Sequence, residues 1–245
     1  MKLREIDLDM PYEKNEERIQ QIQEKNGISR EEAVKLDYEL HWKKKRNQFR
    51  LKTRCMTAMI ERIMEPVNTD DCWKILFECH KEEDESKEDD DIKNLLGVYA
   101  VRTRFNFEEF WESDSCGKKK MVIETIAVTV KKYKNNISFN LEGICAACEQ
   151  ITALGYVNEW IWRKTLKLGK KQVRIQMRHE VEEMDIYMVF LNDDKQICNR
   201  ILLVRAVPDE WNYSEYLGKL ERVSDDSAAL VTKNGERLIG ICKPD

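Results

Sequence analysis

Long hydrophobic runs are missing from this sequence. No stretch approaches the roughly 18 consecutive apolar residues that a membrane-spanning helix needs, and the opening residues, MKLREID, lack the apolar stretch of a signal peptide. The eight cysteines are irregularly spaced, and the chain of 245 residues is too long to need a disulfide scaffold. We therefore expect a cytoplasmic protein with free thiols and no membrane contact.

Glycine and histidine are scarce, and neither forms a catalytic signature. The nine glycines build no phosphate-binding loop, no dinucleotide fingerprint and no Gly-x-Ser-x-Gly elbow. The three histidines, His41, His80 and His179, fit no His-Glu-x-x-His pattern. We therefore assign no catalytic residue, no cofactor and no metal ligand, and we expect His179 to be a core residue of a strand.

One cysteine pair resembles a metal or redox motif. Cys145 and Cys148 are three residues apart and share a helix face. They lie within an apolar stripe that includes Ile144 and Ile151, and free cysteine packs as a small hydrophobic residue. We expect core packing for both thiols.

Charge is abundant and sorted into blocks. The totals nearly balance, with 42 Lys and Arg against 46 Asp and Glu. Yet Lys43–Arg54 and Arg163–Arg178 each carry seven cations and no acid, while Glu82–Asp91 carries eight acids and only one lysine. The like charges within each block repel one another. Each block therefore needs solvent, a partner or a block of opposite charge to offset this repulsion.

The two basic blocks provide the candidate partner-binding residues. Trp42, Phe49, Trp160 and Trp162 lie near these cations, and cations interleaved with aromatics can hold phosphates and stack bases. A solvated helix face and a charge-protected edge strand explain the same pattern. The candidates are Lys43, Lys44, Lys45, Arg46, Arg50, Arg54, Arg163, Lys164, Lys170, Lys171, Arg174 and Arg178.

The first 66 residues are predicted to be helical. Gly27 is a suitable stop for a first helix, and Ser29 with Glu32 forms a capping box for a second. The second helix would run to Glu65, before Pro66, for roughly 54 Å at 1.5 Å per residue. Its basic stretch divides the apolar stripe, so the helix either breaks near residues 46–48 or crosses solvent there.

Beyond residue 69 the helical spacing of apolar residues gives way to an alternation of apolar and polar residues. We predict strands near 73–79, 95–105, 121–131, 173–181, 185–191 and 197–207, a helix at 141–151 and a final hairpin at Asn234-Gly235. Regular strand–helix alternation is absent, which disfavours a parallel sheet. The predicted fold is α+β: a helical segment (1–66) followed by a domain (69–245) with a mainly antiparallel sheet and one covering helix.

Three functions remain open. The first is a cytosolic interaction module of the inhibitor, immunity or adaptor type, which binds a protein partner through segregated charge. The second is a nucleic-acid-binding protein that uses segments 43–54 and 163–178. The third is a divalent-metal enzyme built on dispersed acids such as Glu108-Glu109, Glu182-Glu183-Asp185 and Asp209-Glu210.

Overall fold

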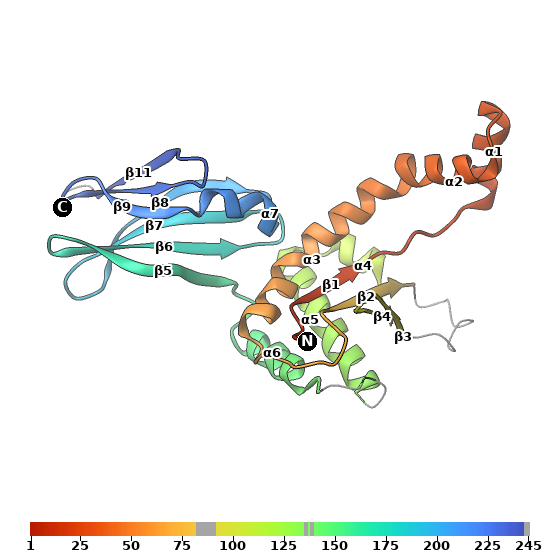
Figure 1. The fold of residues 1–245 in the computed structure, drawn as a ribbon, viewed down its shortest axis with the longest axis horizontal. Helices are drawn as coiled ribbons and strands as arrows, with labels where there is room; N and C mark the ends of the chain where they lie inside the picture. The colour runs from red at the N-terminus through yellow and green to blue at the C-terminus, as the bar shows by residue number, and fades with distance from the viewer. Residues whose placement is uncertain (82–91, 135–136, 138–139, 243–245) are drawn as a thin grey trace. The chain divides into compact units, whose positions relative to one another are not determined.

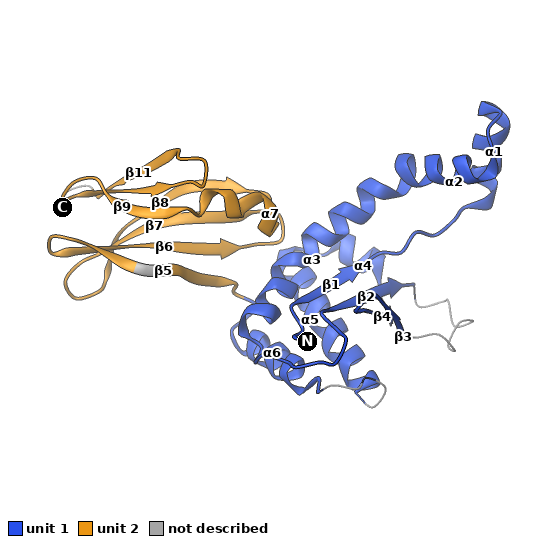
Figure 2. Cartoon of the chain, in the orientation of Figure 1, with its two compact units in different colours: residues 1–156 blue, residues 157–245 orange. Residues whose placement is uncertain are grey.

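The protein has two compact units, shown in different colours in Figure 2. A computed structural model describes residues 1–81, 92–134, 137 and 140–242; the acidic run Glu82–Asp91 lies outside these residues. Unit 1 is Met1–Tyr156 and unit 2 is Val157–Asp245. Helices occur with largely antiparallel sheets, which confirms the α+β class. Among the described residues, no helix has the length and apolarity needed to cross a membrane.

The division between the units differs from the expected boundary after residue 66. Strand β1 (Glu5–Asp9) precedes the helices and pairs in parallel with β2 (Lys74–His80), so the first 66 residues share a sheet with a strand beyond that boundary. The sequence pattern had indicated only helices here. The strand is short, and its alternation of Ile6 and Leu8 with acids spans only five residues.

The sheet of unit 1 is mixed rather than antiparallel. Its order is β1-β2-β4-β3, with β1, β2 and β4 parallel and β3 antiparallel to β4. The prediction that a parallel sheet is absent is therefore wrong for unit 1, because β1 was not recognised as a strand. The expected strand at 95–105 is a hairpin of β3 (Ile92–Leu95) and β4 (Val98–Arg104). Gly97 makes its turn with a φ of 80°, where an added Cβ would meet the Trp73 ring.

The first two helices begin and end where the capping residues in the sequence predict. Helix α1 (Glu16–Asn26) ends at Gly27, which has a φ of 63°. Helix α2 (Arg30–Asp37) begins with the complete capping box of Ser29 and Glu32.

The long helix continues through residues 46–48 without a break. A π-helical turn (Tyr38–Trp42) joins α2 to α3 (Lys43–Ile63), and the three run on in succession (Figure 1). The irregularity thus comes just before the basic stretch. Phe49 is fully buried on α3 and packs edge-on against the rings of Phe105 and Phe110, with centroids 5.2 Å away in both cases.

The strand predicted at 121–131 is wrong, because this segment lies inside helix α5 (Ser115–Tyr133). Its buried residues, which include Val122, Ile126 and Val130, are four apart and form one helix face. Their β-branched side chains had favoured a strand, but Val128 on the same supposed strand face is 67% exposed. Packing against the neighbouring helices outweighs the local preference for a strand.

The remaining helices of unit 1 are α4 (Phe107–Glu112) and α6 (Glu142–Ala153).

Helix α6 confirms the helix predicted at 141–151, and it packs on α5 and α3. We expected this helix to cover the antiparallel sheet. It belongs to unit 1, whereas the two fully antiparallel sheets belong to unit 2.

Unit 2 is built from two antiparallel sheets, with orders β5-β6-β7-β8 and β11-β10-β9. Alternate residues of β6, such as Val173, Ile175 and Met177, enter a shared buried cluster with Met188 and Leu230. The predicted hairpin at 234–235 is present, and a turn at 192–195 joins β7 to β8 in a second hairpin. The elements are β5 (Glu159–Leu168), β6 (Lys171–His179), β7 (Met184–Leu191), β8 (Ile197–Ala206), α7 (Glu210–Tyr213), a 3-10 turn (Ser214–Tyr216), β9 (Lys219–Arg222), β10 (Ser227–Val231) and β11 (Arg237–Ile241).

Candidate functional site

The arginines of the first basic segment pair with acids of β1. Arg46 Nε donates to Asp9 Oδ1 at 2.8 Å. Arg54 Nη1 lies 3.3 Å from Asp7 Oδ1, and Arg50 Nη2 lies 3.9 Å from Asp7 Oδ2. The Asp9 side chain is only 5% exposed. These cations are therefore largely neutralised within unit 1.

This pairing follows from matching helix and strand repeats. Residues four apart on a helix rise by about 6 Å, and residues two apart on a strand rise by about 6.6 Å. Arg46 and Arg50 therefore keep step with Asp9 and Asp7 along β1, which lies against α3 (Figure 1). Arg54 shares Asp7 with Arg50 and also pairs with Glu61, at 2.7 Å. We call this set the α3–β1 charge zipper.

The lysines and aromatics of this segment also have intramolecular roles. Lys43 Nζ bonds Glu39 at 2.7 Å, and Lys45 Nζ lies 5.9 Å from the Trp42 ring centroid. Lys44 is exposed. Trp42 donates its indole N–H to a backbone carbonyl, and the buried Phe49 ring cannot stack on a base.

The second basic segment is divided between two strands and a turn. Lys170 is exposed in the turn, and Lys171 Nζ lies 3.1 Å from Asp226 Oδ1. Trp160 and Trp162 pack against the buried cluster of unit 2. The side chains of Arg163 and Lys164 are not among the described ones. Arg174 and Arg178 remain together on β6.

Arg174 and Arg178 belong to one face of the sheet β5–β8, opposite the buried cluster. Because side chains alternate along a strand, Arg174, Gln176 and Arg178 project away from the core that holds Val173, Ile175 and Met177. Register places Val189, Tyr187 and Asp185 beside them on β7. We call the outer face the set Glu159, Ile161, Arg174, Gln176, Arg178, Asp185, Tyr187, Val189, Arg200, Leu202 and Arg205.

Arginine, tyrosine and carboxylate side chains form a continuous network on the outer face. The Arg200 guanidinium stacks on Tyr187, with its central carbon 3.8 Å from the ring centroid. Tyr187 Oη donates to Asp185 Oδ2 at 2.8 Å, and Arg205 Nε donates to Asp185 Oδ1 at 2.8 Å. Glu159 Oε2 accepts from Gln176 at 2.7 Å.

These contacts determine the ionisation states of the groups on the outer face. Burial alone would raise the pKa of Asp185, but the hydrogen bonds from Arg205 and Tyr187 outweigh burial and lower it. The hydrogen bond from Arg178 to Glu180 raises the pKa of that arginine. Asp185 is therefore ionised at neutral pH and holds its neighbours in place.

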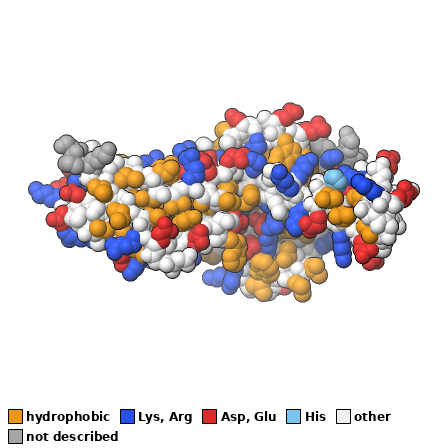
Figure 3. Space-filling view, turned by 90° about the horizontal axis from the view of Figure 1, so that it is seen from above, with side chains coloured by type: hydrophobic (Ala, Val, Ile, Leu, Met, Phe, Trp, Pro, Cys, Tyr) orange, Lys and Arg blue, Asp and Glu red, His pale blue; other side chains and the backbone are white. Residues whose placement is uncertain are grey.

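The outer face is close to neutral where these contacts form. Arg178 pairs with Glu159 and Glu180, Arg200 with Glu159, and Arg205 with Glu183 and Asp185. Lys and Arg side chains are also interspersed with Asp and Glu on the side of the molecule that Figure 3 shows. A polyanion-binding surface needs uncompensated cations, which this network does not supply.

Two polar atoms of the outer face are shielded and unsatisfied. Within the described structure, neither Arg174 Nε nor Gln176 Oε1 has a hydrogen-bond partner, although both atoms are buried. The two residues are neighbours on the same side of β6. A buried donor without an acceptor costs about 1–3 kcal/mol, so a complementary group that reached these atoms after the shielding side chains moved aside would be favoured.

The predicted core roles of His179 and Cys148 fit the structure, whereas Cys145 is only half-buried. His179 is fully buried, and its Nε2 lies 3.2 Å from the Pro208 carbonyl oxygen. Cys148 is buried, which raises the pKa of its thiol to about 12, and burial also raises the pKa of Cys145. Among the described residues, no three His, Cys, Asp or Glu side chains are placed to hold a metal ion.

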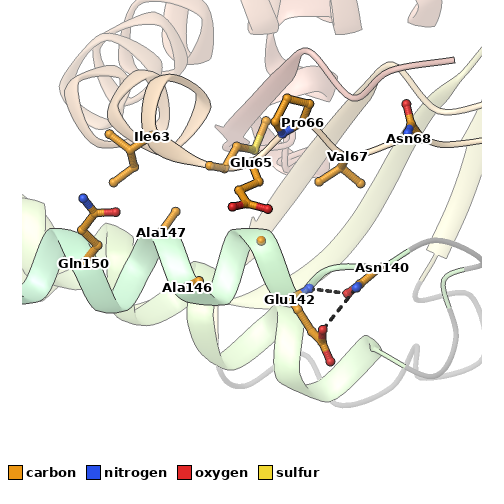
Figure 4. A pocket seen from close by; sticks show the side chains of 12 residues that line it. Ile63, Glu65, Pro66, Val67, Asn68, Asn140, Glu142, Ala146, Ala147 and Gln150 are labelled. Atoms are coloured by element: carbon orange, nitrogen blue, oxygen red, sulfur yellow. Dashed lines mark hydrogen bonds between the residues drawn. The ribbon is translucent and has the colours of Figure 1, made fainter.

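One concavity of unit 1 lies between α6 and the chain that continues from α3 (Figure 4). It has a volume of about 650 Å³ and is lined by Gly143, Ala146 and Ala147 on the helix. Of the described residues that line it, Glu65 and Glu142 carry charge, and both are acids. The same described lining has no histidine, cysteine, serine or lysine.

Sequence reasoning missed Arg200, Arg205 and Tyr187. Arg200 and Arg205 lie five apart on β8, and a bulge in the β7–β8 pairing brings both to the outer face. A strict period of two would have placed them on opposite faces. The signal that could have found Tyr187 is its alternation with Asp185 on β7, opposite the inward Ile186 and Met188.

Comparisons with known proteins add no functional assignment. No family model matches the chain, and neither the curated proteins nor the solved structures include a match. We therefore infer function from the chemistry of the outer face.

Proposed function

We propose that this protein is a cytosolic interaction module, of the inhibitor, immunity or adaptor type, that docks a partner protein on the outer face. Arginine and tyrosine are the side chains most enriched at the energetic centres of protein interfaces. Here they are held in place by hydrogen bonds, which reduces the ordering cost of binding. The eight free thiols fit a reducing compartment.

The observation that carries this proposal is the unsatisfied pair on β6. Arg174 Nε needs an acceptor and Gln176 Oε1 needs a donor. A partner segment with a carboxylate next to a backbone N–H or a hydroxyl would satisfy both atoms once the side chains that shield them move aside. Ile161 and Leu202, 39% and 42% exposed, lie in the same cross-strand row as Gln176 and offer apolar contact.

Nucleic-acid binding is the weaker hypothesis. The aromatics near the two basic segments lie in cores or in backbone contacts, and most of the arginines are paired with carboxylates. A mobility shift with random RNA and DNA should show no binding even at low salt. A strongly salt-dependent shift would favour the nucleic-acid function instead.

The test of the proposal compares three variants in quantitative affinity capture from the native cell extract. Arg174→Glu should lose the partner, because it reverses the charge at the unsatisfied donor. Arg174→Lys keeps the charge but lacks the Nε donor, so it should also bind weakly. Lys233→Glu makes the same charge change on an exposed turn and should bind like the parent chain.

The captured partner, once purified, gives the quantitative result. Loss of a hydrogen-bonded interfacial charge costs about 2 kcal/mol or more, which corresponds to a rise in Kd of about thirtyfold. Equal capture by all three variants would contradict docking at Arg174.

A further inference from the structure

Two cysteines from different sheets of unit 2 lie with their sulfurs in contact. Cys198 is on β8 and Cys242 comes directly after β11, and their Sγ atoms are 3.9 Å apart. The neighbouring Asn199 Nδ2 donates to the Ile241 carbonyl at 3.3 Å, so the two strand edges are already joined there. A disulfide bond is about 2 Å long, so the sulfurs need to approach by about 2 Å.

The two thiols differ in access to solvent. Cys198 is exposed, whereas Cys242 is 2% exposed. Lys171 Nζ hydrogen-bonds the Cys242 side chain and also lies 3.1 Å from Asp226 Oδ1. A dissolved oxidant therefore meets Cys198 first, and Cys242 is held beside it as the second sulfur.

We propose that Cys198 and Cys242 form a peroxide-sensitive dithiol that closes to a disulfide between the two sheets of unit 2. The Cys198 thiolate attacks hydrogen peroxide, the O–O bond breaks, and a sulfenic acid forms as hydroxide leaves. Cys242 then attacks that sulfur, the S–O bond breaks, and the second hydroxide takes the thiol proton to leave as water. Overall, two thiols are oxidised and one peroxide is reduced to two waters.

The surroundings of Cys198 set the rate of this reaction. Partial burial and the neighbouring Cys242 raise the pKa of the Cys198 thiol, while the nearby Lys171 opposes this. The thiolate is therefore a minor species at pH 7. Oxidation should be slow at pH 7 and faster at pH 9, as expected for a sensor of strong oxidative conditions rather than a catalytic thiol.

The disulfide would close a loop that contains β9, β10 and β11. Such a cross-link lowers the conformational entropy of the unfolded chain and thereby stabilises the folded unit. Oxidised protein should therefore unfold at a thermal midpoint about 5 °C or more above that of reduced protein.

The test treats the reduced full chain with hydrogen peroxide, blocks remaining thiols with N-ethylmaleimide and maps peptides by mass spectrometry. We expect a linked peptide pair containing Cys198 and Cys242, about 2 Da lighter than the two thiols, which dithiothreitol separates. Cys198→Ser should abolish the link and the rise in thermal midpoint. Cys116→Ser removes another exposed cysteine and should preserve both.

Either of two results would overturn the proposal. One is a Cys198 oxidised to sulfinic acid while Cys242 is still alkylated. The other is a linked pair that includes Cys116 in place of Cys198. Circular dichroism of the reduced variants, which should match the parent chain, confirms that the substitutions leave the fold intact.

Discussion

At the scale of single residues, the buried carboxyl of Asp37 shows how unit 1 handles charge. Its side chain is fully buried and accepts hydrogen bonds from Arg18 and from the Tyr12 hydroxyl. The Arg18 hydrogen bonds lower the pKa of Asp37 although burial opposes them. Burial, together with Asp37, raises the pKa of Tyr12 to about 12. These contacts tie α1 and the chain before it to α2.

Asp37→Asn should therefore destabilise unit 1 in a pH-dependent way. The folded-state pKa of Asp37 lies below its unfolded value, so its stabilising effect is present above about pH 4 and is lost as pH falls further. The variant should lose about 3 kcal/mol at pH 7 and show a smaller further loss on acidification than the parent chain. Thermal unfolding at pH 7, 4 and 3 measures this, with Asp193→Asn in an exposed turn as the control. Parallel pH profiles for both variants would refute the assignment.

At the scale of elements, the α3–β1 charge zipper shows why charges that are segregated along the sequence are not segregated in the folded protein. The basic face of α3 meets acids of β1 that lie more than 30 residues earlier in the chain, as in Asp9 with Arg46. No local pattern reveals this contact, since it depends on recognising a five-residue strand. The same limit explains the α5 error, where β-branched residues gave a strand signal and tertiary packing selected a helix.

The zipper should show measurable coupling between its partners. In a double-mutant cycle, Asp9→Asn and Arg46→Gln should together cost less than the sum of the single changes, by about 1–3 kcal/mol. Urea unfolding gives the four free energies. The exposed pair Glu16 and Arg30 serves as the reference, and its coupling should be about 0.5 kcal/mol or less. Equal coupling energies for the two pairs would show that the zipper adds nothing beyond a surface ion pair.

The outer face was only partly predictable for a related reason. Alternation along β6 predicted that Arg174 and Arg178 share a side, and the structure places them so. Their neighbours Tyr187 and Arg200 come from other strands, so finding them requires the sheet register and its bulges. The caps at Gly27 and Ser29, by contrast, are local and were predicted correctly.

At the scale of the whole molecule, unit 2 has a core of its own. Among the described residues, its buried cluster lies between Leu168 and Cys242, and the strands of both of its sheets lie between Glu159 and Ile241. A contiguous segment with a self-contained core is expected to fold alone.

The fragment 157–245 should therefore fold without unit 1. We expect a cooperative thermal transition and a dispersed amide NMR spectrum. A fragment that ends at Asp226 lacks β10, the central strand of its sheet, and should be unfolded. A disordered spectrum from the full fragment would show that unit 2 needs unit 1 to fold.

Site-specific photo-cross-linking can show whether a partner protein docks on the outer face. A photoreactive phenylalanine analogue replaces Leu202 on the outer face in one chain and Ile239, an exposed residue of β11, in another. After irradiation in the native extract, we expect a protein adduct from position 202 that Arg174→Glu abolishes, and none from position 239. Adducts from position 239 alone, or an adduct at 202 that survives Arg174→Glu, would contradict it.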